Sequence, residues 1–390
     1  MRSHFRGSLR TWMARRWQAP VLLALVASSC GSLLDGHAPS ITMKRLWFTP
    51  FSGQNGWPGL PAVDSGVVLV GVMGGIAAFD LRTGAPRWRA QIWSGEKMSF
   101  AGNIAARDGL ACIADYFGVG CVDIATGGVR WSHSVDQPTQ DGQSAMDGTA
   151  LYYGTTDHAV LARNLTNGDV LWSTDIDPGN DFGSRVYGVS LRGDTVFAAT
   201  VRWLNLSGGV IVGDLIALDR LTGRELWRYT APSKSGFQGA PVLAGNLGVV
   251  NDAYSHGLVA IDLTTRQVVW RTDVHEDGYI TAETPPVLVG DTLYSGSTDT
   301  QVYSVNLHTG AYRWRVGTRA GSIGSTAVCG RLVLVVPFSG GPLSAVDRVR
   351  LIADRPTVLQ GDELTGRIAV SGNTAYATGT RGVYALTCPD

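Results

Sequence analysis

The chain has 390 residues, of which 16% are charged, 50 are glycine and 12 are tryptophan. This composition is typical of many short strands joined by turns, and it argues against a helical bundle or a disordered chain. Lysine and arginine together number 32, as do aspartate and glutamate, so the chain carries no basic surplus of the kind that binds nucleic acid.

The first 29 residues have the pattern of an export signal. Five arginines and no acidic residue accompany an apolar run at residues 19–27, which is shorter than the roughly 20 residues that a membrane-spanning helix needs. Ser28 and Ser29 are small residues directly before Cys30, as in lipoprotein signals. We predict cleavage before Cys30 and acylation of this cysteine, with ordinary signal cleavage as the alternative. Residues 30–43 are expected to form a tether.

Removal of residues 1–29 changes the charge balance. The remaining chain has 27 basic and 32 acidic residues, a net charge of −5, so DNA and RNA are not expected as partners. No second long apolar run follows Cys30. Contact with a membrane is therefore expected only through the lipid anchor.

A repeated frame organises the rest of the chain. Residues 78–88 read A-x-D-x-x-T-G-x-x-x-W, and the position of the Asp returns after 43, 41, 55, 43 and 44 residues. Two degenerate copies follow, around Asp347 and at residues 383–387, which makes eight copies in all. The good copies lie at residues 78–88, 121–131, 162–172, 217–227, 260–270 and 304–314. Such self-similarity at a fixed period is the signature of a repeat architecture.

Each period of the repeat has room for four strands. The eighth copy ends before its last strand, whereas Trp47 closes a strand that no frame precedes. The two ends of the chain are therefore expected to complete one sheet. We predict an all-β fold, a single eight-bladed β-propeller of four-stranded blades over residues 44–390, closed by an N-terminal strand.

The residue types of the frame have physical reasons. The Thr-Gly pair supplies a residue that takes positive φ at little cost, and the preceding Asp or Asn accepts hydrogen bonds from the amides of the turn. The tryptophan ends up on the outermost strand, where it packs against the neighbouring repeat. A structural role is therefore expected for the repeat tryptophans, with ligand stacking as the alternative: Trp47, Trp88, Trp131, Trp172, Trp227, Trp270 and Trp314.

Four cysteines remain after Cys30. Cys112 and Cys121 lie on what should be adjacent strands of one hairpin, where they either form a disulfide or are two small buried hydrophobic residues. A pairing of Cys329 with Cys388 is the second disulfide that an exported chain of this kind permits.

The step from Asn164 to Asp219 is about twelve residues longer than the others. The excess lies at residues 175–183 and 203–209, and it brings in two apolar residues, Trp203 and Leu204. Insertions in repeat proteins map to loops, and loops carry binding. A partner or ligand contact is expected here, with neutral elongation of a loop as the alternative.

The frame resembles the tryptophan-docking motif of the PQQ-type β-propellers. A lipoprotein signal followed by one eight-bladed propeller is similar to the BamB family, the outer-membrane lipoprotein subunit of the β-barrel assembly machinery. The resemblance implies a non-catalytic scaffold without a cofactor, anchored in the outer membrane and facing the periplasm. It also implies two kinds of partner, the BamA-like core subunit of that machinery and unfolded outer-membrane proteins.

The resemblance also suggests a partner site. In that family a loop entering the fourth blade contacts the barrel-inserting subunit through Leu and Arg side chains. The corresponding run here is residues 181–187. It adds Phe182, Arg185 and Tyr187 to Trp203 and Leu204 as candidate partner-binding residues. The next blade's loop, at residues 234–238, lacks the acidic residues that the family has there.

Two alternatives belong to other functional classes. An exported propeller can bind a small ligand or glycan in its central funnel. A PQQ-dependent dehydrogenase shares the repeat, but those enzymes hold a metal through Glu, Asn and Asp and often have adjacent cysteines. This chain has no Cys-Cys pair and no histidine spacing typical of a zinc site. No catalytic, cofactor-binding or metal-binding residue is therefore predicted.

Overall fold

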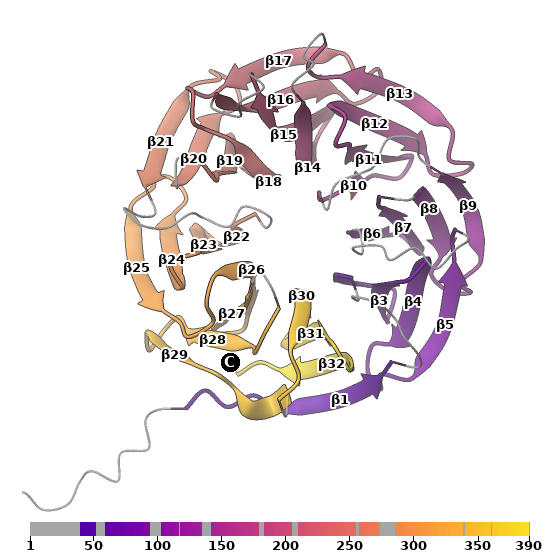
Figure 1. The fold of residues 1–390 in the computed structure, drawn as a ribbon, viewed down its shortest axis with the longest axis vertical. Helices are drawn as coiled ribbons and strands as arrows, with labels where there is room; N and C mark the ends of the chain where they lie inside the picture. The colour runs from indigo at the N-terminus through magenta and orange to yellow at the C-terminus, as the bar shows by residue number, and fades with distance from the viewer. Residues whose placement is uncertain are drawn as a thin grey trace, which may run out of the picture. The chain divides into compact units, whose positions relative to one another are not determined.

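The computed structural model describes residues 40–389 apart from 52–58, 94–102, 117, 135–141, 179–182, 205–209, 255–256, 274–284, 338–339 and 360. The described chain belongs to one compact unit and contains eight four-stranded antiparallel sheets, arranged as the blades of a ring (Figure 1). The prediction of an all-β, eight-bladed propeller is confirmed.

The first four blades use sixteen consecutive strands, each blade running from the centre of the ring to its rim (Figure 1). Blade one contains β2 (Pro61–Asp64), β3 (Val67–Val72), β4 (Gly75–Asp80) and β5 (Pro86–Gln91); blade two β6 (Ile104–Arg107), β7 (Leu110–Ala114), β8 (Gly118–Asp123) and β9 (Val129–Ser134); blade three β10 (Ala145–Met146), β11 (Ala150–Gly154), β12 (Ala159–Asn164) and β13 (Val170–Asp175); blade four β14 (Ser184–Arg192), β15 (Thr195–Trp203), β16 (Ile211–Asp219) and β17 (Glu225–Thr230).

The remaining blades follow the same order, except that the last takes its outer strand from the N-terminus. Blade five contains β18 (Phe237–Ala244), β19 (Leu247–Asp252), β20 (Gly257–Asp262) and β21 (Val268–Asp273); blade six β22 (Val287–Val289), β23 (Thr292–Gly296), β24 (Gln301–Asn306) and β25 (Tyr312–Gly317); blade seven β26 (Ile323–Cys329), β27 (Leu332–Pro337), β28 (Ser344–Asp347) and β29 (Ile352–Asp354); blade eight β30 (Leu364–Ser371), β31 (Thr374–Gly379), β32 (Gly382–Thr387) and β1 (Arg45–Pro50). A short 3-10 turn, Thr357–Leu359, is the one helical element of the described residues.

The N-terminal strand closes the ring. β1 pairs with β32 in antiparallel register, with Trp47 opposite Ala385 and Thr49 opposite Val383. This pairing covers the edge that β32 would otherwise expose, which is the usual way in which a propeller avoids an open sheet edge.

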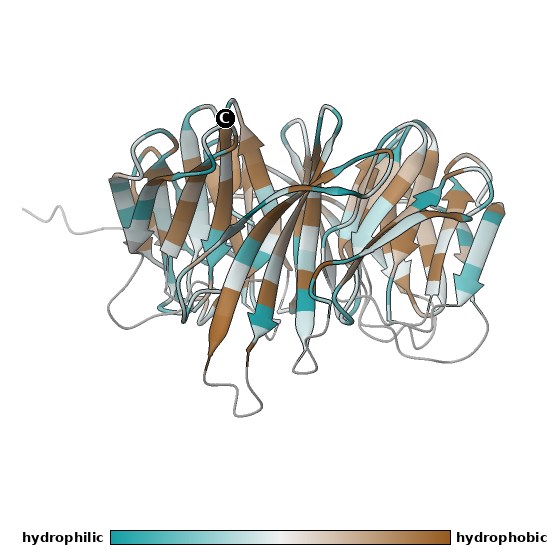
Figure 2. Ribbon diagram, turned by 90° about the horizontal axis from the view of Figure 1, so that it is seen from above, coloured by the Kyte–Doolittle hydropathy of each residue, from teal (hydrophilic) through white to brown (hydrophobic). Residues whose placement is uncertain are grey.

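The core lies between the faces of neighbouring blades. Middle strands such as β3 and β27 are buried along their whole length, because a neighbouring blade covers each of their faces. The outer strands alternate between buried and exposed residues, as in β9. Figure 2, an edge-on view, shows the apolar colour in the strands and the polar colour mostly at their ends and in the turns.

Most repeat tryptophans link one blade to the next. In five of them the indole N–H donates to a backbone carbonyl, and the accepting residue directly follows the Asp or Asn of the next frame. The N···O distances are 3.2 Å from Trp47 to Leu81, 2.8 Å from Trp88 to Ile124, 2.9 Å from Trp131 to Leu165, 2.9 Å from Trp172 to Arg220 and 2.9 Å from Trp270 to Leu307.

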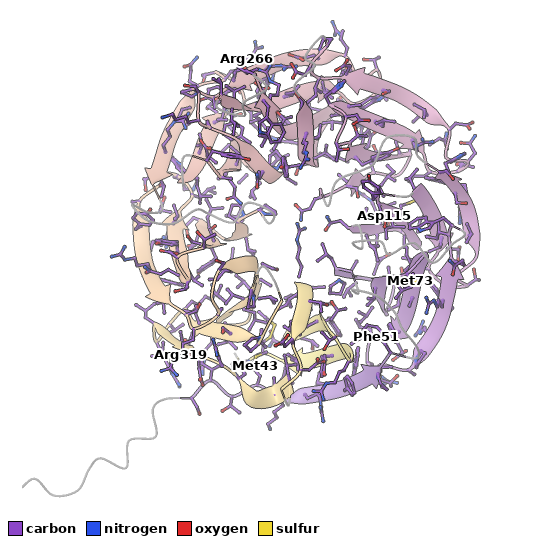
Figure 3. All side chains as sticks on the ribbon, in the orientation of Figure 1. Met43, Phe51, Met73, Asp115, Arg266 and Arg319 are labelled. Carbon is purple, nitrogen blue, oxygen red and sulfur yellow. A yellow bond between two sulfur atoms is a disulfide. The ribbon has the colours of Figure 1, made fainter. Side chains whose placement is uncertain are left out.

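The other two repeat tryptophans have different partners. Trp227 lies under the guanidinium of Arg266, with Cζ 5.9 Å from the ring centroid, and Figure 3 shows Arg266 on the outer rim of the ring. Trp314 packs against Tyr294, with 5.8 Å between ring centroids. The contacts of all seven rings are therefore contacts within the propeller framework.

Both cysteine pairs are joined by disulfides in the structure. Cys112 and Cys121 face each other on β7 and β8, where they are register partners. Cys329 is at the end of β26 in blade seven, and Cys388 follows β32 of blade eight. The Cys329–Cys388 disulfide therefore joins blade seven to blade eight, the blade in which β1 closes the ring.

The long step of the repeat is partly strand rather than loop. β14, β15 and β16 each have nine residues, whereas the middle strands of the other blades have at most six. Trp203 is the last residue of β15 and pairs with Ile211. The expectation that all the excess residues form loops is therefore wrong, because the cross-strand pairing of β15 and β16 continues into the inserted residues.

The predicted tether extends too far into the folded part. Ile41 and Met43 are each 7% exposed and belong to the apolar cluster between blades seven and eight. The packed domain therefore begins before Lys44. Cys30 and the predicted signal peptide lie outside the described residues.

Among the described residues there is no helix with the length and apolar character that a membrane crossing requires.

Candidate functional site

Arg185 and Trp203 meet at the point where the chain enters blade four. Arg185 lies opposite Val201 in the pairing of β14 with β15, so Trp203 is its diagonal neighbour on the same face of the sheet. The Arg185 guanidinium lies over the Trp203 indole, with Cζ 5.5 Å from the ring centroid. This is the geometry of a cation–π contact.

The pair borders an open groove at the junction of blades three and four. The groove has a volume of about 340 Å3, and its lining is Thr156, Gly183, Ser184, Arg185 and Trp203. Arg185 is exposed and Trp203 is partly exposed. Leu204, the next residue, is 41% exposed. The surface therefore presents a cation, an aromatic ring and an aliphatic side chain close together.

A buried ionic network lies directly beneath this surface. Arg202, between Val201 and Trp203 on β15, forms ion pairs with Asp214 and, at 3.1 Å, with Asp177. Ser184 donates a hydrogen bond to Asp177. Because Arg202 is also the register partner of Ser184, the network ties together the two strands that carry Arg185 and Trp203.

Asp214 is the centre of the network. Its side chain is fully buried and accepts hydrogen bonds from the Thr230 hydroxyl at 2.6 Å and from Arg228 at 3.4 Å. Burial alone would lower the pKa of Arg202, but the Asp214 and Asp177 carboxylates outweigh this effect and hold the pKa above its usual value. The guanidinium stays charged, which is what a buried carboxylate requires of its partner.

The structure does not bring every predicted residue to the groove. Tyr187 lies in a bulge of β14 between Val186 and Gly188, is partly buried, and does not line the groove. Phe182 lies outside the described residues. Arg185 and Trp203, which come from separate runs of the sequence, are the pair that the fold joins.

Three residues in or beneath the groove were not predicted as site residues from the sequence. Thr156 comes from the turn between β11 and β12 in blade three, and Arg202 and Asp177 support the groove from below. The alternation of a strand identifies Arg202 as lying on the opposite face from Trp203. Nothing in the sequence by itself indicates that Thr156 lines the groove together with Arg185 and Trp203.

A second groove lies on the inner strands of blades two to five, facing the centre of the ring. Its volume is about 410 Å3. The lining residues are mainly small or uncharged, and they are Asn103, Ile104, Gln143, Ser144, Ala145, Val189, Ser190, Leu191, Ala240, Pro241 and Leu243. Arg367 of blade eight donates to the side-chain carbonyl of Asn103 at 2.9 Å, so one cation lies near this groove.

The described lining of this central groove does not fit the metal ion of a dehydrogenase. Its described lining contains no carboxylate or imidazole, whereas a hard cation needs several oxygen ligands, with carboxylates among them. In the part of the chain that the structure describes, no group of three His, Cys, Asp or Glu side chains is arranged to hold a metal ion.

The comparisons with known proteins point to one family. The family model described as "Outer membrane protein assembly factor BamB" matches residues 42–210 and 160–349. The outer membrane protein assembly factor BamB of Burkholderia pseudomallei (strain K96243) is 22% identical over an alignment of 386 residues, gaps included, and the match covers 84% of this chain and 98% of that protein.

Solved structures share the architecture. BamB from Moraxella catarrhalis superposes with a TM-score of 0.68 at 15% identity, covering 88% of this chain and 99% of that one. A europium-containing methanol dehydrogenase superposes with a TM-score of 0.65 at 13% identity, covering 87% and 85%. At such identities the superpositions establish the fold alone, whereas the family model spans more than half of the sequence. The chain therefore belongs to the family of the outer membrane protein assembly factor BamB.

Proposed function

We propose that this chain is a lipid-anchored, non-catalytic scaffold that takes part in the assembly of outer-membrane proteins. The match of the BamB family model over residues 42–349 carries the proposal. The Arg185–Trp203 groove adds a surface suited to a protein partner.

The groove at blade four would bind the partner through few side chains. Arginine and tryptophan are the residue types most often dominant at interfaces. The stacking of Arg185 on Trp203 holds both side chains in place before binding, which lowers the entropy lost on association. Leu204 adds an exposed apolar contact. The proposed partner is a BamA-like core subunit, with unfolded outer-membrane proteins as transient clients.

The proposal places the chain at a membrane. Export would be directed by residues 1–29, and acylation of Cys30 would hold the mature chain to the membrane's periplasmic face. Residues 31–39 would then join the lipid to the folded domain.

Co-purification from detergent-solubilised envelope tests the proposal. Replacement of Arg185 by Glu (R185E) reverses the charge at the groove and removes the cation–π contact, so recovery of the BamA-like subunit should fall at least about tenfold. R192E is the matched control, because Arg192 is also exposed and lies at the other end of β14. If wild type and R185E recover the BamA-like subunit equally well, the proposed site is wrong. If the wild-type protein recovers no outer-membrane assembly subunit at all, the proposed function is wrong.

The central groove favours a second candidate, a small polar ligand or glycan. Its uncharged hydrogen-bonding lining and the nearby Arg367 are the observations that support it. A panel of mono- and oligosaccharides tested by thermal unfolding checks this candidate. A sugar that raises the melting temperature of the wild type but not of a Gln143→Ala variant would support it, whereas no shift with any of them would count against it.

A further inference from the structure

The turn between β28 and β29 in blade seven differs from the equivalent turns of the other blades. Its left-handed position, which is glycine in most copies, is Leu351, with φ of 56°. Val349 is 74% exposed and Leu351 is 45% exposed. A leucine with positive φ is disfavoured, and here it does not bury its side chain in the core in return.

This turn is held rigidly by one buried carboxylate. The side chain of Asp347 is 1% exposed and accepts the backbone N–H groups of Val349 and Arg350, both at 3.0 Å. It also forms an ion pair with Arg331 at 3.0 Å. The same carboxylate forms an ion pair with Arg350 at 3.8 Å, although the Arg350 side chain is 53% exposed. Arg355, just beyond β29, is exposed as well.

The N-terminal segment packs beside the same part of the rim. The backbone N–H of Ile41 donates to Asp354, in β29, at 2.8 Å, and Met43 is buried between blades seven and eight. In Figure 3, Met43 lies near the start of β1. Lys44 and Arg45, the next two residues, are exposed. The chain therefore enters the ring next to the apolar turn.

The hydrogen bond between Ile41 and Asp354 brings two runs of exposed residues to this part of the ring. We call these residues together the basic rim: Lys44, Arg45, Val349, Arg350, Leu351 and Arg355. It carries four cations and two exposed apolar side chains, whereas the chain from Cys30 onward has a net charge of −5. Basic residues interspersed with apolar ones are typical of protein surfaces that lie at an anionic bilayer.

The distance to the proposed lipid anchor is short. Ser40 lies ten positions after Cys30, and ten residue steps span at most about 35 Å when the chain is fully extended. An acylated Cys30 would therefore keep the rim of blades seven and eight near the bilayer. The negative charge of the rest of the chain would turn other faces away from an anionic surface.

We propose that the basic rim docks on anionic phospholipid headgroups of the membrane that holds the Cys30 lipid. This inference rests on the lipid anchor of the proposed function. Arg350, Arg355, Lys44 and Arg45 contact headgroup phosphates, while Val349 and Leu351 enter the interface between headgroups and acyl chains. Docking then fixes the orientation of the propeller, which an acyl chain on a tether does not do by itself.

A fluorescence experiment on the mature acylated chain tests this orientation. A solvent-sensitive fluorophore is attached to a cysteine that replaces Val349 (V349C) or, as the matched control, Leu221 (L221C). Leu221 is 76% exposed and occupies the corresponding turn of blade four, where Asp219 accepts its backbone N–H at 3.1 Å. Each protein is reconstituted in phosphatidylcholine vesicles with or without phosphatidylglycerol.

The expected result is a shift of the emission to shorter wavelength at position 349, in the vesicles with phosphatidylglycerol, and none at position 221. The shift should decline in 1 M salt, where the Debye length is about 3 Å. No shift at position 349, an equal shift at position 221, or a shift at 349 without vesicles that grows with protein concentration would overturn the proposal. The last outcome would identify a second copy of the chain as the occupant.

A second measurement separates the rim from the anchor. Mass spectrometry of the mature chain reports whether Cys30 is acylated. If it is not, the lipid anchor of the proposed function fails, and flotation of that unacylated chain with phosphatidylglycerol vesicles still tests the rim. The double variant V349D/R350E should then bind about tenfold more weakly than wild type, and L221D should bind like wild type. Equal binding of all three proteins would overturn the basic rim.

Discussion

Trp88 lies against Gly127 of the next blade so closely that a Cβ atom on Gly127 would be 2.6 Å from the ring carbon Cδ2. The same contact joins Trp47 to Gly84, Trp131 to Gly168, Trp172 to Gly223 and Trp270 to Gly310. The glycine of the repeated frame therefore has two functions. It takes a positive φ in its own turn and leaves room for the tryptophan of the preceding blade.

Substitution of Gly127 separates these two functions. G127A should lower the free energy of unfolding by about 3 kcal/mol, because the new methyl group both strains the backbone at φ of 74° and displaces the Trp88 ring. G109A is the control, since Gly109 has φ of 79° but open space around its Cβ position. It should cost about 1 kcal/mol. Urea denaturation measures both, and equal losses would refute the role of the tryptophan contact.

The tryptophan side of the contact makes its own prediction. Trp131 is 7% exposed and donates to the Leu165 carbonyl at 2.9 Å. W131A should therefore destabilise the protein by about 3–5 kcal/mol through the cavity that it leaves. W131F keeps much of the ring but loses the donor, and it should cost less, about 1.5 kcal/mol. The control V129A changes an exposed residue of the same strand, so a comparable loss there would contradict the prediction.

Substitution of Arg202, in the ionic network under the candidate site, should lower the free energy of unfolding more than the partial exposure of this side chain suggests. R202M leaves the Asp214 carboxylate, which is fully buried, without its main partner, and should cost about 3–5 kcal/mol of stability. R202K retains the charge but loses the paired geometry of the guanidinium and should fall between wild type and R202M. R192M, at an exposed position, should change stability by less than about 0.5 kcal/mol. A stable R202M protein would show that Asp214 does not need this partner.

Acid should weaken the closing blade through Asp362. Burial raises the pKa of this carboxyl, but hydrogen bonds from the Thr380 and Tyr384 hydroxyls and from backbone amides outweigh burial and hold the pKa below its usual range. A carboxylate with a lowered folded-state pKa stabilises the protein above pH about 4 and loses this contribution as the pH falls through the folded-state pKa.

D362N should therefore be less stable than wild type at pH 7, and its stability should decrease less between pH 7 and pH 3. Y384F, which removes one donor, should have a smaller effect in the same direction. Urea denaturation at pH 7, 5 and 3 measures these differences, and a wild-type pH dependence in D362N would count against the assignment.

The two disulfides should differ in their contribution to stability. Cys329 and Cys388 are 59 residues apart, whereas Cys112 and Cys121 are 9 apart. The loop-closure entropy that a disulfide removes from the unfolded chain grows with loop length. Loss of the Cys329–Cys388 disulfide should therefore cost about 4 kcal/mol, and loss of the Cys112–Cys121 disulfide about 2.5 kcal/mol. Double Cys→Ala variants of each pair test the ranking by urea denaturation. Greater destabilisation by removal of the short-loop disulfide would contradict it.

The repeated frame by itself determined the blade count and the closure of the ring. Each copy is a local hairpin whose turn residues and tryptophan recur at a readable spacing, and the missing last strand with the orphan Trp47 identified the joined ends. The frame does not predict every contact of its own residues. Arg266 takes the place of the glycine in blade five with φ of 63° and stacks on Trp227, which turn chemistry alone does not predict.

Only the tertiary structure decided which residues meet at the candidate site and at the basic rim. Arg185 and Trp203 come together through the register of a lengthened hairpin, and Ile41 meets Asp354 across the closure of the ring. Such contacts depend on how strands pair and how blades stack, because the side chains involved are distant in sequence and obey no common period. Spacing along the chain therefore specifies the blades, and packing between them specifies the surfaces that they present.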